Sequence, residues 1–219
     1  GKSMEQNVSM KINELPSPTW NWLKVNETSI KWSTKIEPCE IAAEGDAVAT
    51  ETEQLSDIET GAGREADAIF ATENTAKYQI LADNAGQDKT VRLHISGKKD
   101  AHTAGCVEIV AKENSTLTVV MDSRVASDAV KVEDSTTEAS LAVRVRMKVE
   151  SGASVRLIQV QMPQEHETLL SDIGGNLIGE GAKVEYIQLF LGKGNLYSGC
   201  RMDLNGKESN FATETGYLG

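Results

Sequence analysis

Short runs in which apolar and polar residues alternate fill the chain from residue 91 onward. They lie at 91–95, 107–110, 117–121, 155–160 and 184–191. Gly, Asn, Ser and Asp separate the runs and favour turns, whereas alternation with a period of two is typical of half-buried β-strands. The pattern therefore predicts a series of short strands joined by tight turns.

Nearly the same line occurs twice in this series. Residues 150–161 read ESGASVRLIQVQ, and residues 180–191 read EGAKVEYIQLFL. Two further turns have the same form, in which small or acidic residues precede an apolar residue that opens a strand. The four apolar residues are 38, 29 and 27 positions apart along the chain: Leu117, Val155, Val184 and Phe211. The last two spacings are close enough to indicate one structural repeat.

A repeat of this length without a helix between its strands fits a β-solenoid. Each coil would stack on the next through parallel pairing and bury a column of aliphatic side chains. We therefore expect residues 155–160 to pair in parallel with 184–189. A β-sandwich of antiparallel hairpins is the alternative, but it needs two-residue turns, and Asn205-Gly206 is the one clear turn of that type. The solenoid places four side chains in a shared interior: Val155, Leu157, Val184 and Tyr186.

The first 88 residues have a different pattern. Tryptophan and proline are concentrated in a polar segment at 16–38, and the Trp-x-Trp spacing suits one face of an extended arm that lies against the rest of the protein. Apolar residues at helical spacing predict one amphipathic helix over 64–77. The predicted domains are an N-terminal arm with a short helical region, residues 1–88, and a β-helix core, residues 89–219.

Composition and charge argue against several classes of function. Hydrophobic residues make up 39% of the chain and aromatic residues only 5%, so the core must consist mainly of aliphatic side chains. A formal net charge of −11 argues against nucleic acid binding, which depends on clustered Lys and Arg. No apolar run approaches the ~20 residues of a membrane-spanning helix, and the N-terminus lacks the order of a signal peptide. We expect a cytoplasmic protein that binds neither nucleic acid nor membrane.

Three cysteines, Cys39, Cys106 and Cys200, are widely spaced along the chain. A disulfide framework would have an even number, and a zinc site would have clustered ligands. Free Cys is among the most buried residue types, so buried free thiols are the favoured interpretation. A thiolate pair formed by Cys106 and Cys200 across the coils is the alternative, and it would allow an iron–sulfur ligand set.

The histidines His94, His102 and His166 are candidate metal ligands, because neutral imidazole binds iron and zinc. The most ligand-like arrangement is the triplet Glu165-His166-Glu167. Neighbouring residues of an extended loop point in opposite directions, however. A solvated loop is therefore favoured over a metal site.

A glycine-containing segment at 61–66, GAGREA, matches a relaxed dinucleotide-binding fingerprint and overlaps the start of the predicted helix. The strand that must come before such a motif is missing, because residues 52–57 are polar. The segment is interpreted as a flexible link. No Ser, Cys or carboxylate pair has the setting of an activated nucleophile, so we predict that the protein is not an enzyme. We assign no catalytic, cofactor-binding or metal-binding residue.

A resemblance to a known family lies in residues 170–211, which read LSDIGGNLIGEGAKVEYIQLFLGKGNLYSGCRMDLNGKESNF. This segment resembles the SufB/SufD family of the SUF iron–sulfur cluster assembly system, and SufD more than SufB. Residues 15–26, LPSPTWNWLKVN, are similar to the Leu-Pro and Trp segment near the start of SufD chains. The resemblance covers nearly the whole chain and is weak over 39–100. It implies a right-handed parallel β-helix after an irregular, partly helical N-terminal region.

The resemblance also implies a function. Members of this family act as non-catalytic scaffold subunits, so the chain is expected to work with a SufB-like subunit and a SufC-type ABC ATPase. Any Fe–S cluster or flavin would belong to the full complex, since the chain carries no motif for either. Family members continue further, and the residues connected with cluster building, like the helices that grip SufC, lie in that later part. We therefore transfer no such residue to this chain.

The sequence ends within a predicted coil, at residues 210–219. A solenoid that stopped there would expose strand edges and its aliphatic column. We therefore expect a homodimer of this chain, joined end to end near residues 200–219. The alternative function is that of a carbohydrate-active or carbohydrate-binding β-helix protein, although four Tyr residues offer little surface for stacking on sugars.

Overall fold

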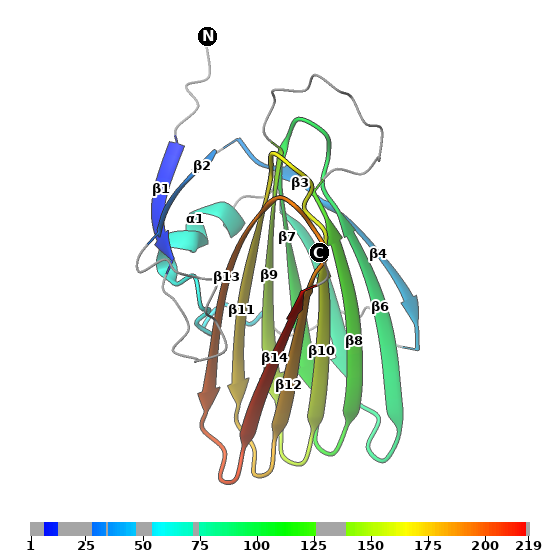
Figure 1. Cartoon of the computed structure of the whole chain (residues 1–219). Coiled ribbons are helices and arrows are strands. Elements are labelled where there is room, and N and C mark those ends of the chain that lie inside the picture. The colour runs from blue at the N-terminus through cyan, green and yellow to red at the C-terminus, as the bar shows by residue number, and fades with distance from the viewer. Residues whose placement is uncertain are drawn as a thin grey trace.

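The computed structural model describes residues 7–12, 28–33, 35–46, 54–71, 75–125 and 139–217. In these residues β-strands provide nearly all of the regular structure (Figure 1). Most of them belong to two sheets. The even sheet contains, in spatial order, β14 (Asn210–Tyr217), β12 (Lys183–Phe190), β10 (Ser154–Gln161), β8 (Thr116–Arg124), β6 (Asp88–Ser96) and β4 (Glu40–Gly45). The odd sheet contains β13 (Asn195–Leu204), β11 (Glu167–Leu177), β9 (Ala139–Val149), β7 (His102–Ala111) and β3 (Glu37–Pro38), and β5 (Ala76–Ala82) also pairs with β7.

The chain passes from one sheet to the other after each strand, so one odd and one even strand form a coil. Five coils follow one another in the described residues, from β5 and β6 to β13 and β14. Every pairing between successive coils is parallel. Strand β4, at the edge of the even sheet, pairs antiparallel with β6. The fold is therefore a parallel β-solenoid, as predicted, and the sandwich is excluded.

The register of the even sheet matches the repeat found in the sequence. Val155 lies opposite Leu117 on one side and Val184 on the other, and Val184 lies opposite Phe211. The four residues assigned as equivalent strand openings therefore form one row across four coils. Because the side-chain period of a strand is two, this register also fixes which residues face the interior.

The turn before each even strand explains why the line is repeated. In each of the five coils, the residue three positions before this row has a positive φ. These residues are Gly86, Asn114, Gly152, Gly181 and Glu208, and Gly86 precedes Lys89, which lies opposite Leu117. The turns bond to one another as well as stack, since the amide of Gly152 donates to the Glu180 carbonyl at 2.9 Å. A small residue such as Ala153 or Ala182 comes next and is fully buried. Each coil therefore needs the same short series of residue types.

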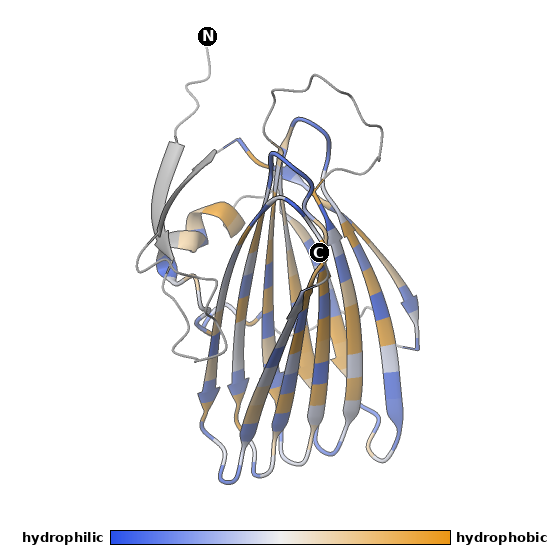
Figure 2. Ribbon diagram, viewed as in Figure 1, coloured by the Kyte–Doolittle hydropathy of each residue, from blue (hydrophilic) through white to orange (hydrophobic). Residues whose placement is uncertain are grey.

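The interior of the solenoid is aliphatic near the start of each even strand. Val155, Leu157, Val184 and Tyr186 all belong to the main buried cluster, which confirms their predicted orientation. Apolar and polar positions alternate along the strands, as Figure 2 shows. Burial of these side chains is the main source of stability for such a fold.

Toward the end of the even strands the interior becomes polar. Gln159, Gln161 and Gln188 are fully buried. The hydroxyl of Tyr186 donates to Gln159 Oε1 at 2.6 Å, and Gln188 Nε2 donates to Gln161 Oε1 at 2.8 Å. The glutamines of the repeated line thus occupy interior positions and bond across coils, although Gln159 Nε2, Gln161 Nε2 and Gln188 Oε1 have no hydrogen-bond partner among the described residues.

The odd sheet is covered on its outer face by residues 54–71, called here the covering segment. Apolar side chains such as Ala66, Ile69 and Phe70 pack there against the sheet. The regular part of the segment is short, with a 3-10 turn at Arg64–Ala66 and α1 at Asp67–Phe70. The predicted helix over 64–77 was therefore too long, because residues from Ala76 onward join β5 and pair with β7.

The N-terminal residues contribute one separate hairpin, in which β1 (Asn7–Ile12) pairs antiparallel with β2 (Thr28–Ser33). Most of the predicted tryptophan arm lies outside the described residues. The solenoid strands begin at Ala76, upstream of the boundary predicted at residue 89, and the division into two domains stays a prediction. In the part of the chain that the structure describes, no helix is long and apolar enough to cross a membrane.

Candidate functional site

The outer face of the odd sheet carries a row of residues with unusual chemistry for a buried surface. The parallel register places Cys106 opposite Arg144, and Arg144 opposite Asp172. Two residues further along β7 and β9, Glu108 lies opposite Arg146. These side chains lie beneath the covering segment, which runs beside the odd sheet in Figure 1. The strands therefore supply the charges, and the covering segment removes them from water.

Arg144 and Asp172 form a buried ion pair. Arg144 Nε lies 2.7 Å from Asp172 Oδ2, and the Asp172 side chain has no exposed surface. The carboxylate accepts two more hydrogen bonds, one from the Thr60 hydroxyl at 2.7 Å and one from the Ala62 amide at 2.8 Å. A buried charge is costly unless its partners are all in place. Asp172 thus holds the covering segment and β9 together.

Arg144 makes two further contacts with the covering segment. Its Nη1 donates to Asp67 Oδ1 at 2.9 Å, and its guanidinium carbon lies 4.5 Å from the centre of the Phe70 ring. A guanidinium over an aromatic face is attracted by the ring quadrupole, and more strongly when water is excluded. One side chain of the sheet therefore contacts both ends of α1.

A second charged pair lies beside the first. Arg146 Nη2 lies 3.0 Å from Glu108 Oε1, and the same oxygen accepts the Leu55 amide at 3.4 Å. Arg146 and Glu108 belong to neighbouring strands, whereas Leu55 opens the covering segment. The two ion pairs therefore fasten the segment at both of its halves.

The first glycine of the GAGREA segment, Gly61, makes a close contact with the sheet. A Cβ on Gly61 would lie 2.0 Å from the amide nitrogen of Cys200, and the Gly61 amide donates to the Ile173 carbonyl at 3.0 Å. The interpretation as a flexible link was therefore wrong. Glycine is needed here because two backbones touch. No strand precedes the motif in residues 54–60, which is consistent with rejecting the dinucleotide fingerprint.

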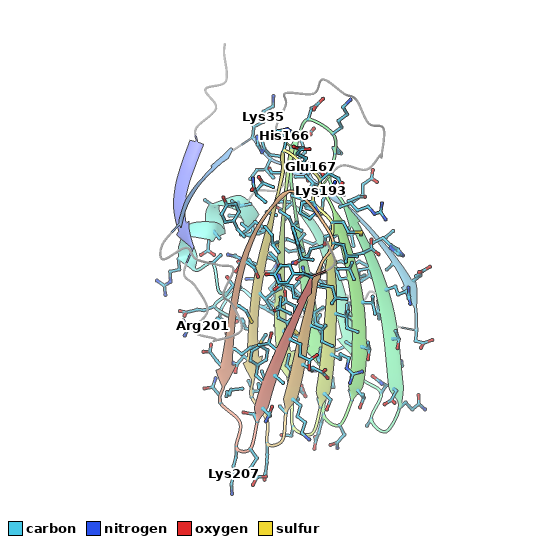
Figure 3. The ribbon with its side chains drawn as sticks, viewed as in Figure 1. Lys35, His166, Glu167, Lys193, Arg201 and Lys207 are labelled. Carbon is cyan, nitrogen blue, oxygen red and sulfur yellow. The ribbon has the colours of Figure 1, made fainter. Side chains whose placement is uncertain are left out.

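A pocket of about 770 Å³ opens between the covering segment and the odd sheet. Several of its charged side chains form ion pairs: Arg201 and Arg64 both pair with Glu59, and Arg144 pairs with Asp67. Figure 3 shows Arg201 on β13 beside this region. The lining contains four arginines and three carboxylates, and most of these charges are paired. The residues that line the pocket are Ser56, Asp57, Ile58, Glu59, Thr60, Gly61, Gly63, Arg64, Asp67, Arg144, Arg146, Cys200 and Arg201.

The three cysteines are free and buried, as predicted. Cys106 lies on the outer face of β7, whereas Cys200 faces the interior from β13 in the row of Ile173. The two are separated by the width of three strand pairings and by the sheet itself, so the Cys106–Cys200 pair is excluded. Burial raises the pKa of Cys39 and Cys200 to about 12 and that of Cys106 to about 11. These thiols stay protonated near neutral pH.

The candidate histidine ligands are not brought together. His94 lies on the outer face of the even sheet, and His102 bonds to the Ser140 hydroxyl at the start of β7. His166 is exposed in the loop before β11, and Figure 3 shows it with Glu167 at the opposite end of the solenoid from Lys207. Within the described residues, no three His, Cys, Asp or Glu side chains are grouped so that they could hold a metal ion.

The residues that fasten the covering segment were missed by sequence reasoning. The available signal was the charge of Arg144, Glu108 and Asp172 within strands that are otherwise buried on both faces. A strand without polar alternation is covered on both sides. Charged residues in such strands indicate buried pairs, but their partners emerge only from the register.

Comparison with known proteins agrees with this architecture. The described residues define a parallel β-solenoid with a covering segment on its odd sheet. The family model described as "SUF system FeS cluster assembly, SufBD core domain" matches residues 94–219, which is more than half of the chain. The chain therefore belongs to the SufB/SufD family of SUF iron–sulfur cluster assembly proteins. Neither the curated proteins nor the solved structures contain a match to it.

Proposed function

We propose that this chain is a SufD-type, non-catalytic scaffold subunit of the SUF complex, and that it acts in the cytoplasm. The observation that carries the proposal is the match of the SufBD core domain to the solenoid coils from His94 onward. The nascent Fe–S cluster is cargo of the complex in this view. Any flavin would also belong to the complex.

The chemistry of the described residues supports a scaffold role. The charged side chains of the outer face are used in bonds between strands and covering segment, as in the Arg144 and Asp172 pair. The thiols are buried and have raised pKa values. Rigid packing of this kind suits a protein that positions partners, because it gives a surface of fixed shape.

The partners proposed are a SufB-like subunit and a SufC-type ABC ATPase. Size-exclusion chromatography with light scattering tests this on mixtures of the purified proteins. We expect the chain to form a heteromer with the SufB-type subunit and to retain SufC only when that subunit is present. The chain alone should hydrolyse no ATP. Failure to bind the SufB-type subunit, together with retention on a polysaccharide resin, would favour the carbohydrate alternative.

The same measurement on the chain alone tests the predicted homodimer. Leu204 and Tyr217 of the last described coil are about half exposed, at 51% and 48%. A mass near twice the 23.7 kDa of one chain supports self-association, and a single-chain mass across the micromolar range contradicts it.

A further inference from the structure

A histidine on the outer face of the even sheet lies between two carboxylates from two other strands. His94 of β6 has Asp122 of β8 opposite it in the register, and its Nδ1 lies 2.5 Å from Asp122 Oδ2. On the other side, His94 Nε2 lies 3.2 Å from Glu44 Oε1 of β4. The three side chains therefore join three neighbouring strands in one line.

The two bonds together determine the protonation state of the ring. An ionised carboxylate accepts hydrogen bonds and cannot donate them. Both ring nitrogens must therefore carry a proton for both bonds to exist, and this is the imidazolium form. A neutral ring has one N–H, so it keeps one of the two bonds and turns a lone pair toward the other carboxylate. Because both ring nitrogens of an imidazolium carry a proton, the His94 ring in this form has no nitrogen lone pair with which to bind a metal ion.

Strand β4 depends on this contact more than the other strands of its sheet do. It is one of the two edge strands, it is mostly exposed, and among the described strands of the even sheet it is the one that pairs antiparallel. Its neighbour β6 is its single strand partner in that sheet. Edge strands held on one side open more easily than central ones.

We propose that Glu44, His94 and Asp122 form a proton-dependent latch that fastens edge strand β4 to the first coils of the solenoid. The latch is closed when the ring is an imidazolium. When the ring loses its proton, the bond to one carboxylate is lost and β4 loosens from β6.

Other charged groups on this face modify the latch without replacing it. From β6, Arg92 lies on the same face as His94 and opposite Glu44. From β8, Arg124 lies two positions beyond Asp122, and from β4, Glu40 lies opposite Ser96. The hydrogen bonds to Glu44 and Asp122 raise the pKa of His94 above its ordinary value, and burial lowers it only slightly.

The sign of the pH dependence follows. A histidine whose pKa is raised in the folded state contributes stability below its unfolded pKa, and this contribution is lost as the pH rises through the folded pKa. The latch therefore holds at pH 6 and loosens toward pH 9.

Hydrogen exchange measured by mass spectrometry tests the latch on the complete chain. Protection factors of the backbone amides at 40–45 are compared at pH 6 and pH 9, after correction for the intrinsic exchange rate. We expect protection to fall about three- to fivefold in the wild type, as suits a partly exposed ion pair. In His94→Gln, which has no titrating ring, the protection factors at pH 6 and pH 9 should agree within about twofold.

The matched control is His166→Asn, which removes an exposed histidine far from β4 and keeps a residue type that tolerates its positive φ of 67°. This variant should behave as the wild type does. The proposal is overturned if the protection of amides 40–45 falls equally in His94→Gln and the wild type between pH 6 and pH 9, or if it does not fall in the wild type.

A second measurement avoids any dependence on how His94→Gln folds. In an NMR titration, the wild-type His94 ring should titrate above its ordinary range, and Glu44→Gln and Asp122→Asn should each lower its pKa. A wild-type ring that titrates at or below the ordinary value of about 6.5 also overturns the latch.

Discussion

Asp172 lies directly opposite Arg144 on neighbouring strands of the odd sheet, and their side chains meet at 2.7 Å beneath the covering segment. The contact joins residues 28 positions apart in sequence. Through Thr60 and Ala62, the same carboxylate holds a segment that is more than a hundred positions away. One buried charge therefore connects two coils with the segment that covers them.

We expect Asp172→Ala to destabilise the protein by about 3–5 kcal/mol, because Arg144 would keep a buried charge with its best partner removed. Chemical denaturation with urea measures this free energy of unfolding. The control is Glu185→Ala, which breaks an exposed pair with Arg156 and should cost less than about 1 kcal/mol. Similar losses for the two variants would contradict the importance of the buried pair.

We expect Gly61→Ala to detach the covering segment. Its Cβ would lie 2.0 Å from the Cys200 amide nitrogen, and neither backbone can move without breaking sheet contacts. Overpacking of this kind costs about 3 kcal/mol. Limited proteolysis should show faster cleavage within 54–71.

Gly63→Ala is the matched variant for that experiment. A Cβ on Gly63 meets nothing within 4 Å, so the strain comes only from its φ of 73°. With a ψ of −170°, Gly63 lies in a region that is essentially restricted to glycine, so the expected cost is about 1–3 kcal/mol, without faster cleavage of the segment. Equal cleavage rates in the two variants would show that the close contact does not hold the segment in place.

At one of the positive-φ turn positions, we predict a substitution that stabilises the protein. Glu208 has a φ of 55°, where the equivalent positions in two other coils are Gly152 and Gly181. We expect Glu208→Gly to raise the free energy of unfolding by about 0.5–1 kcal/mol, since relief of strain exceeds the entropy that glycine adds to the unfolded chain. Gly152→Ala should lower it, because its Cβ would lie 2.1 Å from Asn114 Oδ1. Denaturation midpoints decide both signs.

The solenoid and its register could be predicted because one local pattern recurs. Val155 and Val184 each follow the same turn, so aligning the turns also aligned the strands. The covering segment could not be predicted in the same way. Its apolar residues follow helical spacing through Phe70, but nothing local shows that the chain then leaves the helix to pair with β7.

The buried ion pairs of the outer face could not be predicted from the sequence either. Arg144 and Asp172 carry no sequence signature as a pair, since their spacing depends on the length of β10 and of the two turns between β9 and β11. Once the register is known, their opposition follows directly. Long-range pairing therefore has to be solved before the chemistry of the outer face can be interpreted.

The raised thiol pKa values predict slow modification of the native protein. At pH 8 a thiol with a pKa near 11 or 12 is almost entirely protonated, and the thiolate is the reactive form. We expect a disulfide reagent such as DTNB to react with less than one thiol per chain in the native protein and with all three after unfolding. Above the unfolded pKa of about 8.5, ionisation favours the unfolded chain, so stability should fall as the pH rises. Rapid reaction of the native protein at pH 8 would show that the cysteines are accessible.

The position of the cysteines also predicts that the isolated chain holds no stable Fe–S cluster. Cluster ligands are thiolates that converge on one site, whereas Cys106 and Cys200 lie on opposite faces of the odd sheet. Anaerobic reconstitution with iron and sulfide, followed by desalting and visible absorbance, should leave no stoichiometric chromophore. Cys106→Ser and Cys200→Ser should give the same spectrum as the wild type. A stoichiometric cluster that disappears in either variant would mean that the thiols rearrange to bind it, and the scaffold would then be a cluster-binding subunit in its own right.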